Sequence, residues 1–121
     1  MQVTINGLEA YLAKLYGGKV TEQGLFMKLV EEIGEVAEIL NKQTGRKAPD
    51  GSDLQTELGT ELADVIHYAV AIAAVNDLDL NEIILRKDRQ ASIKYHHDTN
   101  LEAFLLDVES RGKPEKDRQG H

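Results

Sequence analysis

Apolar residues recur every three or four positions along most of this chain, which is the spacing of one face of an α-helix. The longest regular stripe follows Thr21, a residue type that caps helices, and continues to Gln43. Its members are Phe26, Leu29, Val30, Ile33, Val36, Ala37 and Leu40. No stretch of the sequence competes with the alternating pattern of a β-strand. The pattern therefore predicts an all-α protein, folded as a helical bundle.

Helix-breaking residues divide this pattern into four to five helices. Gly17-Gly18 ends the first helix, and Asn76-Asp77 ends the third. The first three predicted helices cover residues 6–16, 22–43 and 54–75. A fourth helix, which Asp79 or Asn81 can cap, ends near Tyr95. A shorter fifth helix covers residues 101–110. The loop between the second and third helices is short and polar, so these two helices can pack antiparallel as a central hairpin.

The third predicted helix is apolar on nearly every side. Between Leu62 and Val75, eleven of the fourteen residues are Leu, Ile, Val or Ala. Such a helix must be covered on nearly every side, and four helices of this length offer little cover. We therefore expect a second subunit to cover part of this helix, in a dimer or a higher assembly. The alternative is that the short fifth helix provides the cover.

Composition and charge narrow the class of protein further. The chain has 121 residues and no cysteine, which favours one domain and excludes disulfides and thiolate metal sites. We expect a single domain over residues 1–110 and a polar, disordered tail over 111–121. With 14 basic and 21 acidic residues the net charge is −7, which disfavours binding to nucleic acid polymers. The start of the chain does not resemble a signal peptide, and no apolar run has the ~18 residues of a membrane span, so we expect a cytoplasmic protein.

Acidic residues gather on two of the predicted helices without cations to balance them. The second helix carries Glu31, Glu32, Glu35 and Glu38, with no Lys or Arg between residues 29 and 41. The third helix carries Glu57, Glu61 and Asp64 as one polar stripe. Opposed across a hairpin, these carboxylates repel each other unless a hard divalent cation neutralises them. Oxygen ligands alone favour Mg²⁺ or Mn²⁺ over Zn²⁺. Each motif by itself is also compatible with an ordinary solvated helix surface.

Two stretches, LVEEIGEVAEIL and ELADVIHYAV, place Glu32-x-x-Glu35 ahead of Glu61-x-x-Asp64. In this order they resemble the all-α nucleoside triphosphate pyrophosphatase superfamily, in its MazG-like branch, over about residues 22–95. The resemblance implies a Mg²⁺-dependent hydrolase, with Mn²⁺ as a possible substitute, that converts a nucleoside triphosphate to the monophosphate and pyrophosphate. It also implies a house-cleaning role and an oligomeric helical bundle. The base and the sugar stay open, a phosphoribosyl nucleotide included.

The resemblance also assigns roles to single residues. It implies metal binding by Glu32, Glu35, Glu61 and Asp64. Catalysis is assigned to Glu31 and Glu35: Glu31 is either an additional metal ligand or the group that orients the attacking water, and which carboxylate acts as the base stays open. Substrate binding is assigned to Tyr68, Lys87 and Lys94. Four cations between Arg86 and Lys94 independently suit the neutralisation of phosphate oxygens, although a solvated helix face has the same composition. The chain departs from the family at Ala91, where relatives often have Asn.

Two other functions are compatible with the same residues. Asp64-x-x-His67 resembles half of the motif of di-iron carboxylate bundles, with further carboxylates available on the preceding helix. Against it, the motif has Asp where Glu is usual. The second alternative is a helical interaction module that kept the bundle and lost catalysis. For His67 itself, a satisfied histidine inside the bundle is the simpler interpretation.

Overall fold

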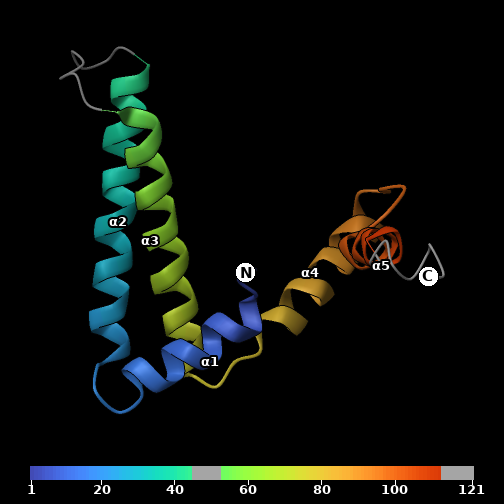
Figure 1. Ribbon diagram of the computed structural model, residues 1–121, viewed down its shortest axis with the longest axis horizontal. Helices are drawn as coiled ribbons and strands as arrows, with labels where there is room; N and C mark the ends of the chain where they lie inside the picture. The colour runs from blue at the N-terminus through green and yellow to red at the C-terminus, as the bar shows by residue number, and fades with distance from the viewer. Residues whose placement is uncertain (45–52, 113–121) are drawn as a thin grey trace, which may run out of the picture. The chain divides into compact units, whose positions relative to one another are not determined.

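The structure, a computed structural model, describes residues 1–44 and 53–112, and these are helical throughout apart from the connections (Figure 1). The prediction of an all-α bundle is confirmed, and helix bounds lie within about one residue of those predicted. The predicted interhelical loop and the predicted tail lie almost entirely outside the described residues. The helices are α1 (Ile5–Tyr16), α2 (Glu22–Gln43), α3 (Leu54–Val75), α4 (Leu80–Lys94) and α5 (Leu101–Arg111).

Short polar side chains start four of these helices, as their sequence positions suggest. The Thr21 hydroxyl accepts a hydrogen bond from the backbone N–H of Gly24 at 2.9 Å, which satisfies one of the unpaired donors at the start of α2. Thr4, Asp53 and Asn100 act in the same way for α1, α3 and α5. At α4, the backbone N–H of Leu80 donates to the Glu9 carboxylate at 3.0 Å, so a side chain of α1 supports this helix start.

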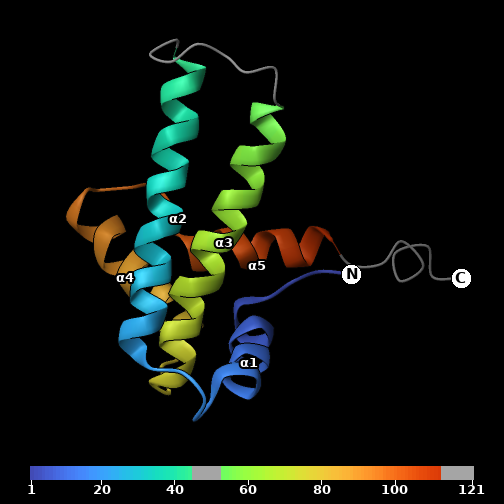
Figure 2. The same ribbon diagram turned by 90° about the vertical axis from the view of Figure 1, so that its left-hand side faces the viewer.

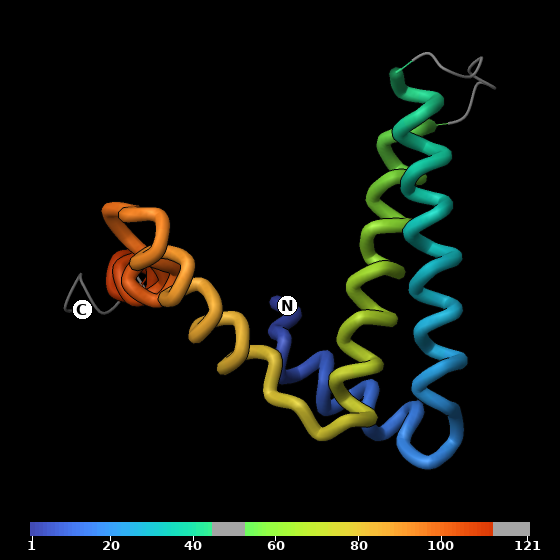
Figure 3. Tube along the Cα trace, turned by 180° about the vertical axis from the view of Figure 1, so that it is seen from behind, coloured from blue at the N-terminus to red at the C-terminus, as the bar shows by residue number. Residues whose placement is uncertain are grey.

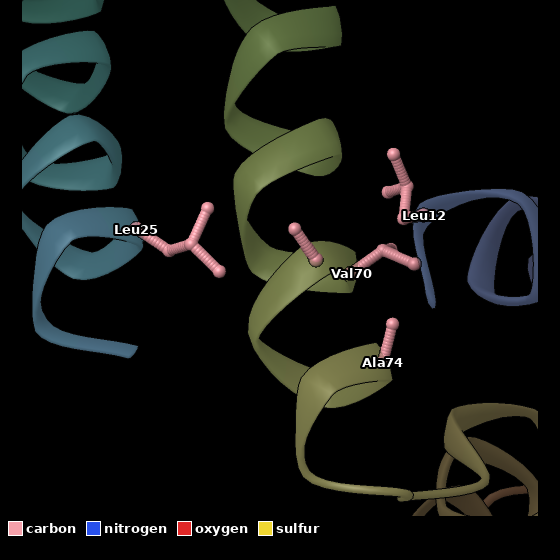
Figure 4. Packing of buried hydrophobic residues seen from close by; sticks show 5 residues of the cluster. Leu12, Leu25, Val70 and Ala74 are labelled. Carbon is pink, nitrogen blue, oxygen red and sulfur yellow. The ribbon is translucent and has the colours of Figure 1, made fainter. Parts of the chain in front are cut away.

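The centre of the N-terminal part is the antiparallel hairpin of α2 and α3, with α1 packed against the C-terminal half of α3 (Figures 1 and 2). The same arrangement is seen from behind in Figure 3. The core lies where α3 passes between the other two helices: Leu12 comes from α1, Leu25 from α2, and Val70 and Ala74 from α3 (Figure 4). Leu12 is completely buried. This core fixes α3 in register against α2, and therefore fixes the carboxylates that both helices carry.

The chain divides into two compact units, residues 1–80 and 81–121. In the second unit, the N–H of Leu101 donates to the Asp88 carboxylate at 2.6 Å. Arg89 also forms an ion pair of 2.8 Å with Glu102 at the start of α5. These two interactions tie the start of α5 to α4. The expectation of a single domain over residues 1–110 stays a prediction.

The apolar stripe predicted on α2 is only partly buried. Leu25 and Ile39, which are not members of that stripe, are buried, while Phe26 is 53% exposed and Ile33 is 52% exposed. The physical reason is the width of the apolar arc on α2, which exceeds what a single neighbouring helix covers. On α3, Leu62 is exposed as well. The first unit thus presents apolar side chains at its surface.

Among the described residues, α3 is the helix with the length and hydropathy that a membrane span requires, with a mean hydropathy of 1.4 over 18 residues. The core helix of a soluble protein has the same properties. Here α3 packs against α1 and α2, and its first half carries Glu57, Glu61 and Asp64. These features favour a core helix.

Candidate metal centre

Three carboxylates from the two hairpin helices meet at one point. One ligand oxygen each from Glu32 on α2 and from Glu61 and Asp64 on α3 lies within 4.8 Å of the others, and all three residues are half-buried. Glu61 and Asp64 share a helix face because residues three apart are neighbours on a helix surface. The hairpin brings Glu32 to that face. The structure thus brings together three of the four residues expected to bind metal.

Two oxygens of this cluster lack a hydrogen-bond donor. The Oε2 atoms of Glu32 and Glu61 are inaccessible to water and have no hydrogen-bond partner. A carboxylate oxygen that loses its water without gaining a donor destabilises the folded state. The cluster therefore requires either protons or a positive charge that the protein itself does not supply at this point.

The ionisation of Glu61 reflects this requirement. A hydrogen bond shared with Glu32, burial, and repulsion from Glu32 and Glu35 together raise the pKa of Glu61 to about 7. Glu35, the fourth residue expected to bind metal, therefore lies close enough to act on Glu61 as well. Near neutral pH, a proton and a cation compete for this carboxylate.

An open groove runs along α2 beside the cluster. It has a volume of about 560 Å³ and includes Glu61 in its wall. The other lining residues are Glu31, Gly34, Glu35, Glu38, Ile39 and Lys42 of α2 and Glu57 of α3. The two residues expected to act in catalysis, Glu31 and Glu35, thus line the same groove. The Glu31 carboxylate also lies 3.6 Å from the Lys28 ammonium. The groove connects solvent to one member of the buried cluster.

Tyr68 lies in a different cavity, on the part of the hairpin nearest α1. This cavity of about 400 Å³ is lined by Tyr68, Tyr16 and Lys28, together with residues at the start of α2. The Tyr16 hydroxyl lies 2.8 Å from Nε2 of His67, and the His67 ring packs edge-on against both tyrosine rings. His67 is therefore held by tyrosines and does not belong to the carboxylate cluster.

The expected phosphate-binding residues lie in the second unit. Lys87 and Lys94 line a groove of about 280 Å³ on α4. Tyr95 and Ala91 line the same groove, and the Lys94 ammonium lies 5.3 Å from the centre of the Tyr95 ring. Ala91 thus presents a methyl group to this groove. Arg89, counted with these cations in the sequence, is instead paired with Glu102.

Some residues of these sites escaped the sequence reasoning. Lys42 lines the groove without having been predicted as a site residue, and Glu57 was predicted only as part of the polar stripe of the third helix. Tyr16 contacts His67 across 51 positions of the chain. A signal existed for Glu57, because it lies one turn before Glu61 on the same stripe. The contact of Tyr16 depends on how α1 packs on α3, which spacing along the chain does not encode.

The cluster suits a hard divalent cation. Its ligand atoms are all carboxylate oxygens, and two of its residues, Glu32 and Glu61, each have an oxygen that is buried without a partner, as expected near a bound ion. Comparison with known families agrees: the MazG nucleotide pyrophosphohydrolase domain matches residues 20–90, more than half of the chain. The chain belongs to the MazG nucleotide pyrophosphohydrolase family. The predicted resemblance is thereby confirmed, and a search among curated proteins gave no match.

Family membership places these residues in context. The matched segment contains α2, α3 and most of α4, and therefore every carboxylate of the cluster. The family's chemistry is hydrolysis of a nucleotide pyrophosphate bond, and divalent metal dependence is general in it. α1, which supplies Tyr16 and the buried Leu12, lies outside the matched segment.

Proposed function

We propose that this protein hydrolyses nucleoside triphosphates to the monophosphate and pyrophosphate, with Mg²⁺, or Mn²⁺ in its place, held by Glu32, Glu35, Glu61 and Asp64. The observation that carries the proposal is the cluster of one oxygen each from Glu32, Glu61 and Asp64 within 4.8 Å of one another. Glu32 and Glu61 each also have a buried oxygen without a hydrogen-bond partner. Such a carboxylate set in a family of nucleotide pyrophosphohydrolases is best explained by cation and phosphate chemistry. When bound, the cation supplies charge that offsets the phosphate oxygens.

Glu31 and Glu35 are the proposed acid–base residues. Both line the open groove, so a water molecule there can donate hydrogen bonds to either carboxylate. In the proposed reaction this water attacks the α-phosphorus, its proton passes to the carboxylate, and the bond from the α-phosphorus to the bridging oxygen breaks. Pyrophosphate leaves with that oxygen. The ammonium of Lys28 lies 3.6 Å from the Glu31 carboxylate at the surface of α2.

Substrate binding is proposed to involve Tyr68, Lys87 and Lys94. Tyr68 and Tyr16 give their cavity two aromatic walls, which suit the flat, partly apolar surface of a nucleobase or sugar. Lys87 and Lys94 offer two ammonium groups to phosphate oxygens from one groove. We further propose a cytoplasmic homodimer or homotetramer with a house-cleaning role.

The di-iron alternative loses its histidine in this structure. His67 Nε2 lies 2.8 Å from the Tyr16 hydroxyl, and the carboxylate cluster of the described chain does not include His67. The remaining alternative is a non-catalytic helical module, which predicts that the protein releases no pyrophosphate from any triphosphate.

The deciding experiment measures pyrophosphate release from a panel of ribo- and deoxyribonucleoside triphosphates, with Mg²⁺ or with EDTA. We expect Mg²⁺-dependent release with monophosphate as co-product, reduced on the order of 100-fold or more in Asp64→Ala, since a metal ligand contributes several kcal/mol to the barrier. The matched control is Glu109→Ala, which removes an exposed carboxylate on α5 and should leave the rate unchanged. Absence of release from every triphosphate by the folded wild type would contradict the proposal, and equal activity of Asp64→Ala and wild type would contradict the site.

A further inference from the structure

Gly34 lies in the middle of α2, where glycine weakens a helix relative to alanine. It also lines the open groove. Apart from its chain neighbours and the nearby backbone of α2 itself, a Cβ atom built on Gly34 meets nothing within 4 Å, so no close packing inside the described chain requires a glycine here. The helix therefore contains a destabilising residue at a position where the folded chain leaves open space.

Gly59 is a natural comparison within the same hairpin. It lies inside α3, and a Cβ atom there also meets nothing within 4 Å apart from its chain neighbours and the nearby backbone of α3 itself. Gly59 does not line the groove, whereas Gly34 does. The two glycines thus share helix context and open surroundings, and they differ in whether they face this groove.

The neighbours of Gly34 indicate what passes over it. Glu31 precedes it by nearly one turn and Glu38 follows it by about one turn, so these side chains lie on the same side of α2 and line the same groove. The bare backbone between them is flanked by carboxylates and has no aromatic neighbour among the lining residues. A phosphate chain accompanied by cations suits this strip, while a nucleobase finds no ring to stack on.

We propose that Gly34 is a specificity-determining residue whose missing side chain provides the clearance for the cation-bound phosphate chain of the substrate. This inference rests on the proposed function and adds the part of the substrate that crosses α2. Its consequence is a trade-off between helix stability and substrate access. An alanine at position 34 strengthens the helix and narrows the groove at the point where the phosphates pass.

The test compares Gly34→Ala with Gly59→Ala in the full-length protein. Both variants should have a melting temperature above that of wild type. In calorimetric titrations, both should bind Mn²⁺ alone like wild type, because every proposed ligand is retained. With Mn²⁺ present, Gly34→Ala should bind two probes ~10-fold more weakly than wild type does, which is the effect of one added carbon in a closely fitting site. The probes are inorganic triphosphate and a non-hydrolysable α,β-imido nucleoside triphosphate. In turnover, the KM of Gly34→Ala should rise by a similar factor with kcat little changed, and Gly59→Ala should match wild type in all these measurements.

Three results would overturn the inference. Equal triphosphate affinity in Gly34→Ala and Gly59→Ala would show that the clearance is not used. Weaker binding of Mn²⁺ alone by Gly34→Ala would show that the methyl group acts on the cation ligands instead. Weaker binding of the nucleotide analogue without weaker binding of inorganic triphosphate would place the nucleoside end over Gly34. A wild-type protein that hydrolyses no triphosphate contradicts the proposed function itself, and the binding titrations still test Gly34 independently.

Discussion

At the scale of single residues, Glu61 belongs both to the half-buried carboxylate cluster and to the wall of the open groove. One of its oxygens is buried without a partner, and its side chain also lines the groove wall. Its pKa of about 7, raised by the hydrogen bond with Glu32, by burial and by repulsion, means that the folded protein holds a proton here that the unfolded chain releases near pH 4.5. The state of the cluster at neutral pH is therefore set by competition between a proton and a cation.

This competition predicts a pH dependence of stability. Between about pH 4.5 and pH 7 the folded state binds more protons at Glu61 than the unfolded state, so the metal-free protein should lose stability as the pH rises through this window. Glu61→Gln, which stays neutral, should flatten that part of the profile. Melting temperatures measured in EDTA between pH 4.5 and pH 8 test this, and an upward slope in wild type across the window would contradict it.

The same pKa predicts how Mg²⁺ acts. A cation must displace the proton of Glu61 below about pH 7, so added Mg²⁺ should raise the melting temperature more at pH 8 than at pH 5.5. In Glu61→Gln the stabilisation by Mg²⁺ should be weak at both values. Stabilisation of equal size in wild type at both pH values would show that the ion does not bind at the Glu61 carboxylate.

Sequence reasoning reached most of this cluster but not all its neighbours. The spacing of Glu61 and Asp64 fixes them on one face, and a short loop makes the hairpin that brings Glu32 to them. The pairing of Tyr16 with His67 could not be predicted in this way, because it depends on packing between helices far apart in the chain. Local periodicity describes faces of helices, and long-range packing decides which faces meet.

At the scale of elements, α1 is held to the hairpin by its buried stripe. Leu12 is fully buried against α3, while Leu15, on the same helix, is 39% exposed. α1 lies outside the matched family segment, so its place in the fold depends on this contact with α3. It also positions Tyr16 beside His67.

Truncation of these two leucines gives a matched prediction. Leu12→Ala should lower the free energy of unfolding by about 3 kcal/mol, because it leaves a cavity in the core, and should lower the melting temperature by roughly 10 °C. Leu15→Ala should cost less than about 1 kcal/mol, since much of this side chain is already in water. Urea denaturation of both variants checks the difference. Equal losses would mean that α1 does not pack on α3 through Leu12.

Helix boundaries were predictable because capping residues and glycines act locally, as Thr21 does at the start of α2. The buried side of α2 was less predictable. The apolar arc was identified from periodicity, yet Leu25 and Ile39 are buried while Phe26 and Ile33 are exposed. Periodicity shows which face of a helix is apolar. Which residues of that face are buried depends on where the neighbouring helix packs.

At the scale of the whole molecule, we predict that a second copy of the chain packs against the apolar arc of α2, which α1 and α3 leave exposed. Phe26, Val30, Ile33 and Leu40 recur at helical spacing, and each is at least 44% exposed. Side chains of this kind gain about 1.5–3 kcal/mol each when they are fully buried, and a contiguous exposed group of them is typical of an interface. On α3, Leu62 extends the exposed apolar surface of the same hairpin.

This surface yields the last prediction, which concerns assembly. We expect wild type to sediment as a dimer or tetramer and Phe26→Glu to dissociate on the order of 100-fold more readily, because a charge buried in an apolar interface costs several kcal/mol. The control is Val3→Glu, which adds the same charge at an N-terminal residue that is 80% exposed and outside the arc, and it should keep the wild-type mass. Sedimentation equilibrium over a range of concentrations measures both. A monomeric wild type would mean that another part of the same chain covers the arc, and an unchanged mass for Phe26→Glu would place the interface elsewhere.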